Sequence, residues 1–235
     1  MQKKTGGRTA HDATADISAL EAEVRGAIAK GDNVQQVVRD LTVKALSTQN
    51  RDLESLRRIM TAVMQGVHDG AQQKLQHTSA HTQTALTPIR DAVAGLDAAL
   101  AQFAEASKLA LEEAAGRAHK FSSEELTRVR GELESVENLF LETVQASAST
   151  AQKVVSETLH DLVAHAKHNG TAVGSQLKDT LAAFNHEITS AGQTRLEAGL
   201  QLTHAITDLM RQVAAGLLTG IAERVKPDDK AKKPG

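Results

Sequence analysis

Histidine pairs are the residues of this chain whose spacing could serve metal chemistry. His77 and His81 stand four residues apart, as do Asp161 and His165, with His168 close behind. On a helix, side chains four apart lie on one face and can share a metal ion. The helical zinc motifs add a glutamate and a third ligand, and neither accompanies these pairs. The pattern therefore predicts surface or interfacial histidines and no metal site.

Catalytic motifs are also missing from the sequence. It has no glycine-flanked serine elbow, no phosphate loop ending in Gly-Lys-Ser/Thr, and no dinucleotide-binding glycine pattern. Acidic residues are spread over predicted helix faces, where pairs such as Glu54 and Arg58 are ordinary solvated ion pairs. A site can still assemble across the helices of a bundle, but nothing singles out a nucleophile or a base. We therefore expect a protein that is not an enzyme and has no cofactor.

Helix-forming residues dominate the elements that would have to position any site. Pro88 is the single proline before residue 227, and the chain has no Cys, Trp or Tyr and only four Phe. Ala, Leu, Gln and Glu lose little side-chain entropy in a helix, whereas proline disrupts its interior. The prediction is an all-α fold of long amphipathic helices in an antiparallel bundle or coiled-coil arrangement.

The charge balance argues against a nucleic-acid partner. The chain has 27 Lys plus Arg against 29 Asp plus Glu, and few aromatic side chains on which bases could stack.

Both ends of the chain are predicted to be disordered, at residues 1–12 and in the charged tail 227–235. Two short helices are expected within residues 13–50. Asp16 is the expected N-cap of the first, whose apolar side chains recur every three or four residues. Gly31 predicts the end of that helix. The basic start of the chain is followed by no apolar segment, so no secretory signal is expected.

Residues 51–226 are predicted to form three or four long helices folded back on one another. Asp52 is the expected N-cap of the first, Pro88 marks a restart, and Ser122 opens a capping box. Residues 169–171 are the next predicted break. Nine apolar residues of the resulting seams are predicted to face protein: Leu56, Met60, Val63, Ile89, Val93, Leu96, Leu133, Val136 and Phe140.

Three pairs of glycines stand four residues apart: Gly66 with Gly70, Gly170 with Gly174, and Gly216 with Gly220. Such pairs form a flat strip that lets a second backbone approach closely. Each glycine also weakens a helix by up to about 1 kcal/mol relative to alanine. For the first two pairs we favour bends or helix ends near turns. The third pair differs because it interrupts the most apolar run of the chain.

That apolar run, within residues 203–225, is the best candidate for a functional surface. It is too short to span a bilayer. Two interpretations stay open. The run lies on a lipid or polymer surface with its polar face in water, or it packs as the last helix of the bundle, the commoner role of an amphipathic stripe. The residues predicted for surface binding or self-association are Ile206, Leu209, Met210, Val213, Leu217, Leu218 and Ile221.

Composition and the chain end carry a family resemblance. An Ala/Gln/Glu/Ser/Thr-rich helical body, the missing Cys and Trp, and the Lys/Pro/Ala-containing residues 226–234 resemble the phasins, small helical bacterial proteins that coat polyhydroxyalkanoate storage granules. Residues 23–25 (EVR), 31–34 (GDNV) and 39–46 (RDLTVKAL) also resemble an uncharacterised family of proteobacterial helical proteins. The first resemblance implies a granule-coating role, and the second implies a bacterial origin and a helical fold. Neither carries a functional residue onto this chain.

One function and one alternative follow. The chain is expected to be a non-enzymatic amphipathic helical protein that associates with a hydrophobic surface, in a phasin-like coat of storage granules. The alternative is a cytoplasmic coiled-coil scaffold or a self-assembling structural protein. Expected partners are a polyhydroxyalkanoate granule or a lipid surface and further copies of the chain in a homo-oligomer. We expect it in the bacterial cytoplasm, with no nucleic acid partner and no transmembrane segment.

Overall fold

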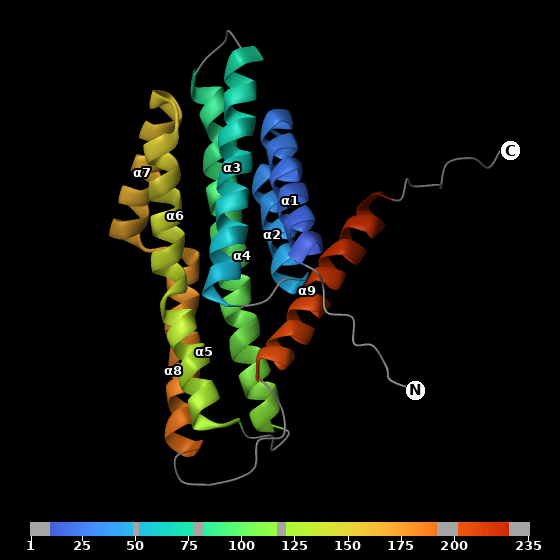
Figure 1. The fold of residues 1–235 in the computed structure, drawn as a ribbon, viewed down its shortest axis with the longest axis vertical. Coiled ribbons are helices and arrows are strands. Elements are labelled where there is room, and N and C mark those ends of the chain that lie inside the picture. Colours follow the sequence, from blue (N-terminus) through green and yellow to red (C-terminus); the bar gives the residue numbers. More distant parts are fainter. Residues whose placement is uncertain (1–9, 49–51, 78–81, 117–120, 192–201, 226–235) are drawn as a thin grey trace, which may run out of the picture.

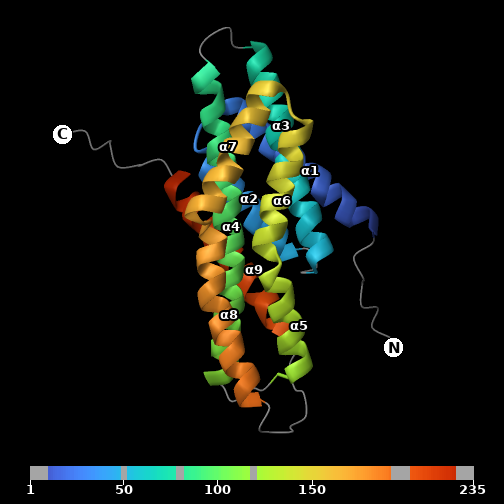
Figure 2. The ribbon, with the colours of Figure 1, turned by 90° about the vertical axis from the view of Figure 1, so that its left-hand side faces the viewer.

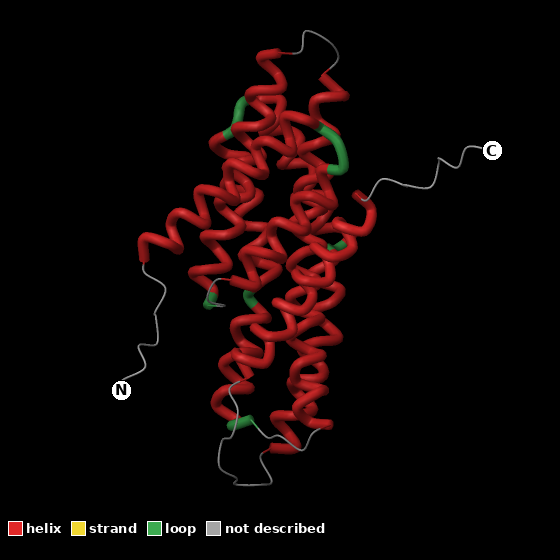
Figure 3. The backbone as a smooth tube through the Cα atoms, turned by 90° about the vertical axis from the view of Figure 1, so that its right-hand side faces the viewer, coloured by secondary structure: helices red, strands yellow, loops and turns green. Residues whose placement is uncertain are grey.

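The computed structural model describes residues 10–48, 52–77, 82–116, 121–191 and 202–225. Throughout these residues the chain forms α-helices joined by short turns, and none of them belongs to a β-strand (Figure 3). For residues 216–225 only the helical backbone is described. The all-α fold predicted from the composition is confirmed.

The helices of the described residues follow one another along the chain. They are α1 (Ala10–Lys30), α2 (Val34–Thr48), α3 (Leu53–His77), α4 (Thr82–Gly116), α5 (Ser123–Glu134), α6 (Val136–Thr150), α7 (Lys153–Asn169), α8 (Ala172–Ala191) and α9 (Leu202–Val225).

Four antiparallel rods form the body of the molecule. The first rod is α3, and α4 runs back beside it (Figure 1). Helices α5 and α6 stack end to end as the third rod, and α7 and α8 stack in the same way as the fourth (Figure 2). Contacts of α4 with α8, α5 with α8, and α3 with α6 close the bundle. The predicted antiparallel helical bundle is confirmed.

Three of the described helices lie outside the four rods. Helix α1 packs on α3, α2 packs on α4, and α9 crosses α2 and α4 obliquely (Figure 1). Because α1 and α2 contribute to the same hydrophobic core as the long helices, they are part of one packed unit. The disorder predicted for residues 1–9 and 227–235 concerns segments outside the described residues.

Local signals place several helix ends where the sequence predicts them. Gly31 follows α1 with a φ of 83°, and Gly170 follows α7 with a φ of 84°. This left-handed conformation costs glycine little and ends many helices. At the start of α3, the Asp52 carboxylate accepts a hydrogen bond of 2.7 Å from the Ser55 N–H. The turns at both glycines and the Asp52 N-cap are therefore confirmed.

Two predicted helix starts are wrong. Helix α1 begins at Ala10, so residues 10–12 are helical and Asp16 lies inside the helix. No Gly or Pro separates Ala10 from Asp16, so nothing prevents an earlier start. Pro88 lies inside α4 and not at its first turn. Its ring is buried next to Gly31, so packing against the α1–α2 turn offsets the lost backbone hydrogen bond.

The seam predicted from residue 126 to residue 166 is interrupted twice, so the expected number of long helices is wrong here. The break at Ser135 is slight, with φ −85° and ψ −13°, and leaves α5 and α6 in one rod. At Ala151 and Gln152 the backbone is extended, and the chain reverses into α7. The available signal was the Ser/Thr-rich run 147–150, whose hydroxyls donate to backbone carbonyls of α6.

The hydrophobic core runs along the seams of the bundle. The nine residues predicted to face protein are all buried, which confirms that prediction. Among the described large apolar side chains, Leu109 alone is strongly exposed, at 46%. In this state the described apolar seams face one another within a single chain and leave a polar exterior.

Two glycines of α3 lie at its contact with α1, so the predicted bend there is wrong. A Cβ atom on Gly66 would stand 2.6 Å from the Glu21 carbonyl oxygen. On Gly70 it would stand 2.7 Å from the Arg25 carbonyl oxygen. The missing side chains let the two backbones approach closely. At the Gly170 pair, by contrast, α7 does end and α8 begins just beyond, so the predicted helix end is confirmed.

Candidate functional site

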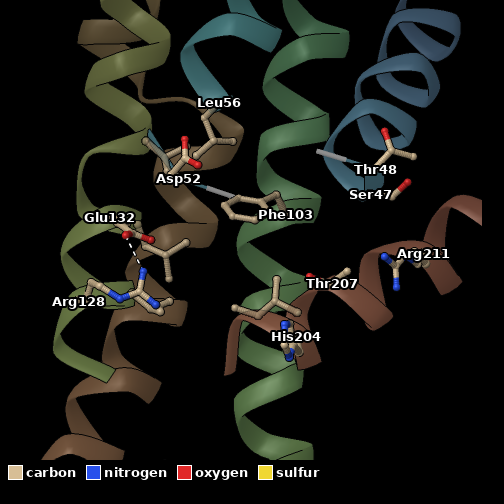
Figure 4. A pocket seen from close by; sticks show the side chains of 14 residues that line it. Ser47, Thr48, Asp52, Leu56, Phe103, Arg128, Glu132, His204, Thr207 and Arg211 are labelled. Carbon is tan, nitrogen blue, oxygen red and sulfur yellow. Dashed lines mark hydrogen bonds and ion pairs between the residues drawn. The ribbon is translucent and has the colours of Figure 1, made fainter. Parts of the chain in front are cut away.

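A cavity of about 430 Å³ lies where α9 crosses the body (Figure 4). The end of α2, the start of α3, the middle of α4, helix α5, the first turn of α6 and the first half of α9 enclose it. Natural small-molecule sites occupy about 300–1,000 Å³ and combine an apolar lining with a few polar groups. This cavity has both features, and it is the best candidate for a functional site.

The floor of the cavity is apolar. Phe103 of α4 lines it, and its ring lies on the side of α4 where Asp52 and Leu56 stand (Figure 4). The apolar side chains that line it, all of which are otherwise buried at helix interfaces, are Leu56, Phe103, Val129, Leu133, Val136 and Ile206. An apolar group placed here would leave water without displacing a charge.

On α9, polar side chains line the edge of the cavity. His204, Thr207 and Arg211 are spaced by three and four residues, which places them on one face of the helix. Arg211 donates a hydrogen bond of 3.0 Å to Asp208. This pair is largely exposed, so it contributes little to stability and can exchange partners. The α9 edge therefore offers hydrogen-bond donors close to solvent.

Opposite α9, the charged lining residues are already engaged. Arg128 of α5 forms an ion pair of 2.8 Å with Glu132, one turn further along the same helix (Figure 4). Asp52 accepts the N-cap hydrogen bond of Ser55. Both carboxylates therefore have cationic or N–H partners within the protein, and the α9 edge is the more open side.

A carboxylate of α5 holds the first turn of α9. The N–H of Leu202 donates a hydrogen bond of 2.7 Å to Glu125. The N–H of Glu125 in turn donates to the Ser122 hydroxyl at 3.1 Å, the N-cap contact of α5. The Ser122 half of the predicted capping box is confirmed. Its glutamate satisfies a free N–H of another helix, which sequence spacing could not reveal.

The predicted association residues on α9 divide into three groups. Ile206 and Met210 are buried against the body, so in this conformation they form part of the core and not an open contact face. They are buried because, together with Leu202 and Ala214, they form an i, i+4 stripe that faces α2 and α4. Leu209 and Val213 are partly buried beside that stripe. At Leu217, Leu218 and Ile221 the structure describes the helical backbone alone.

A second polar cluster lies where α7 meets α8. Asp97 of α4 accepts hydrogen bonds from the N–H groups of Ala172 and Val173, at 2.8 and 2.9 Å. Glu137 of α6 accepts one of 2.5 Å from the Thr171 hydroxyl. Two carboxylates from neighbouring rods therefore satisfy the positive end of α8.

The cluster places two carboxylates in a partly dry site. Burial raises the pKa of the Asp97 carboxyl above its ordinary value, and the charge of Glu137 adds to the rise. The hydrogen bonds from Val173 and Ala172 act in the opposite direction. The Glu137 carboxylate lies in the space that a side chain on Gly174 would fill, so a larger residue there would have to displace it. We assign the cluster a structural role, since every acceptor named here already binds a donor of α8 or its N-cap.

The histidines singled out by spacing do not form a site together. Asp161, His165 and His168 are exposed on α7, and His165 contacts the Asn169 side chain at 2.9 Å. His77 ends α3 with its backbone alone described, and His81 lies outside the described residues. Within the part of the chain that the structure describes, no three His, Asp or Glu side chains gather as metal ligands would. No helix in that part is both long and apolar enough to span a bilayer.

Residues 10–227 match DUF6781, a family of unknown function, so the chain belongs to that family. No curated protein and no solved structure matches the chain.

Proposed function

We propose that this member of DUF6781 is a non-enzymatic amphipathic helical protein that associates with a hydrophobic surface, in the manner of the phasin coat on storage granules. Helix α9 is the contact element. It leaves the body at the surface and exposes its apolar stripe there. The four antiparallel rods stay folded and keep their polar exterior towards water.

The placement of α9 supports this proposal most directly. Helix α9 crosses the rods obliquely instead of lying along them, and a cavity remains beneath it. Its described buried side chains form one stripe, and Leu202 is held by a single side-chain acceptor, Glu125. Release of α9 would expose this stripe, which includes Ile206, together with Phe103 of the cavity floor. An apolar face that is hidden in water would then become available.

Moving the apolar stripe of α9 from the body to an external surface should change the free energy little. Fully burying one side chain such as Ile206 or Met210 contributes about 1.5–3 kcal/mol, so α9 stays on the body in water. A lipid or polymer surface covers the same apolar groups, so most of that free energy is recovered on transfer. A modest preference for the surface is then enough to shift the equilibrium.

The alternative is a coiled-coil scaffold or self-assembling protein whose seams are buried between chains. The described seams are already filled within one chain, which gives this alternative less support. In that case concentration alone, without any added surface, should drive assembly. Sedimentation velocity across a range of concentrations distinguishes the two.

The direct test is to tie α9 to the body. The chain has no cysteine, so Thr48→Cys with Thr207→Cys supplies two thiols that line one cavity from α2 and α9. A short bismaleimide then bridges them. The bridged protein should lose co-sedimentation with polyhydroxyalkanoate particles or phospholipid vesicles, while each single-cysteine variant treated with the same reagent keeps it. Equal binding by bridged and unbridged protein would contradict α9 as the contact element.

A second variant tests the distal half of α9. Leu217→Asp with Ile221→Asp should abolish binding to particles or vesicles, because a charged side chain is costly on an apolar surface. Deletion of residues 227–235 should change binding little, since Asp228 and Asp229 offset much of the lysine charge of that segment. Circular dichroism must show unchanged helicity in both variants. Normal binding by the double aspartate variant would move the contact face elsewhere.

A further inference from the structure

We infer that the cavity beneath α9 binds a small carboxylate with an apolar chain, for which octanoate is the simplest probe. The inference depends on the cavity lining and not on the proposed surface binding, so each can fail alone. A cavity of about 430 Å³ with an apolar floor and polar groups on one edge has the composition of a small-molecule site.

The floor selects the apolar chain. Phe103, Leu133 and Ile206 meet there from α4, α5 and α9, and all three are buried. Arg128 and Glu132 lie on the α5 side of the Phe103 ring, and Arg211 lies on the other side, on α9 (Figure 4). A flexible saturated chain can follow such an irregular space, and it loses only apolar hydration on entry.

The α9 edge selects the head group. The guanidinium of Arg211 has five N–H donors, and one of them binds the exposed carboxylate of Asp208. His204 and Thr207 stand on the same helix face. A ligand carboxylate here would receive charge-assisted hydrogen bonds and keep part of its hydration, since 63% of the Arg211 side chain is exposed. An ammonium head group would meet the same guanidinium with like charge.

The bound molecule would connect α9 to the body. Its chain fills the space between Phe103 and Ile206, and its head group binds the polar face of α9. A ligand that binds only the conformation with α9 in place stabilises that conformation by mass action. Octanoate should therefore slow amide hydrogen exchange in α9 as well as bind.

Isothermal titration calorimetry on the full-length protein tests the ligand's head group and its alkyl chain separately. Octanoate should bind saturably with one site per chain. Acetate, which lacks the chain, should show no binding, and octylammonium should bind at least about tenfold more weakly, which is about 1.4 kcal/mol. Equal affinity for octanoate and octylammonium, or no saturable octanoate binding up to about 100-fold molar excess, would overturn the inference.

Matched tryptophan variants test the location. Thr207→Trp places a large side chain into the cavity, whereas Gln212→Trp places it on an exposed position of α9 outside the lining. The first should lose octanoate affinity by at least about tenfold, and the second should keep it within about twofold. Equal octanoate binding by both variants would exclude the cavity as the site.

Arg211→Gln supplies an independent check if Thr207→Trp changes the circular dichroism spectrum. It removes the charge but keeps a polar side chain, so the octanoate affinity should fall about tenfold. Unchanged affinity in a folded Arg211→Gln variant would contradict the assigned head-group position. Vesicle binding by the same variants is measured separately, because the proposed surface function predicts that it survives loss of octanoate binding.

Discussion

The α1–α2 hairpin and helix α9 both lie outside the four rods and both contact α4, but they are held differently. At the hairpin, Gly66 and Gly70 of α3 let α1 approach to backbone contact. Gly95 of α4 does the same for α2, since a side chain there would collide with the Gln35 carbonyl. At α9 the contact is made by larger side chains such as Met210, and a cavity of about 430 Å³ remains.

The difference lies in how the two contacts respond to separation. Where the α1 and α3 backbones are in close contact, at Gly66 and Gly70, α1 cannot move away without losing many dispersion contacts at once. A helix that packs across a cavity already lacks some of those contacts, and its release therefore costs less. Under the proposed function, α9 is therefore the helix that leaves the rods, and α1 is the helix that stays on them.

Substitutions that push α1 away from α3 should have the largest effect on the free energy of unfolding. In Gly66→Ala with Gly70→Ala, each new Cβ atom meets an α1 carbonyl oxygen that cannot move alone. Overpacking costs about 1–3 kcal/mol per site, and the upper half of that range applies because the colliding atoms belong to the backbone. Improved helix propensity returns about 1 kcal/mol per site, or about 2 for both. We expect a net loss of about 2–4 kcal/mol in urea unfolding. An unchanged or raised stability would show that α1 is not held by these glycines.

Weakening α9 should produce a smaller and local effect. Met210→Ala removes a fully buried side chain. It should lower stability by about 2 kcal/mol, at the low end for such a truncation, because the cavity beside α9 lets the site relax. Hydrogen exchange should accelerate in α9 and stay unchanged in α3 and α4. If exchange in α3 and α4 accelerates equally, α9 unfolds together with the body and is not a separate layer.

The Asp97 cluster should make the stability of the protein depend on pH. Its folded pKa is raised from 3.8, so the folded state binds the proton more tightly than the unfolded chain does. The resulting stabilisation is present below the unfolded pKa and is lost as pH rises through the folded pKa. From about pH 7 to about pH 4, the wild-type protein should gain stability relative to Asp97→Asn. Urea unfolding at several pH values measures this, and a pH-independent difference would contradict it.

Gly131→Ala should have the smallest effect and the opposite sign. Gly131 lies inside α5, and a side chain there would meet no atom within 4 Å. Alanine should therefore raise the unfolding free energy by up to about 1 kcal/mol through helix propensity. Gly26→Ala in α1 is a second control of the same kind. If these two substitutions destabilise the protein like those at the α1–α3 contact, the close-approach explanation is wrong.

Sequence spacing located many features because they depend on neighbours along the chain. The Asp52 and Ser122 N-caps, the turns at Gly31 and Gly170, and the buried seam residues all follow from local hydrogen bonding and helical periodicity. The turn at residues 151–152 was missed because it contains neither glycine nor proline. The Ser/Thr-rich run before it is only a weak competitor for backbone hydrogen bonds.

The sequence by itself determined an all-α chain, its main seams and an apolar C-terminal segment, because helix propensity and periodicity are local. Only the tertiary structure decided what those segments meet. It made Gly66 and Gly70 a contact instead of a bend, turned Glu125 towards Leu202, and buried Ile206 and Met210. Each of these outcomes depends on which helices lie side by side. Amphipathic periodicity predicts which face of a helix is buried, but it does not predict which helix packs against that face.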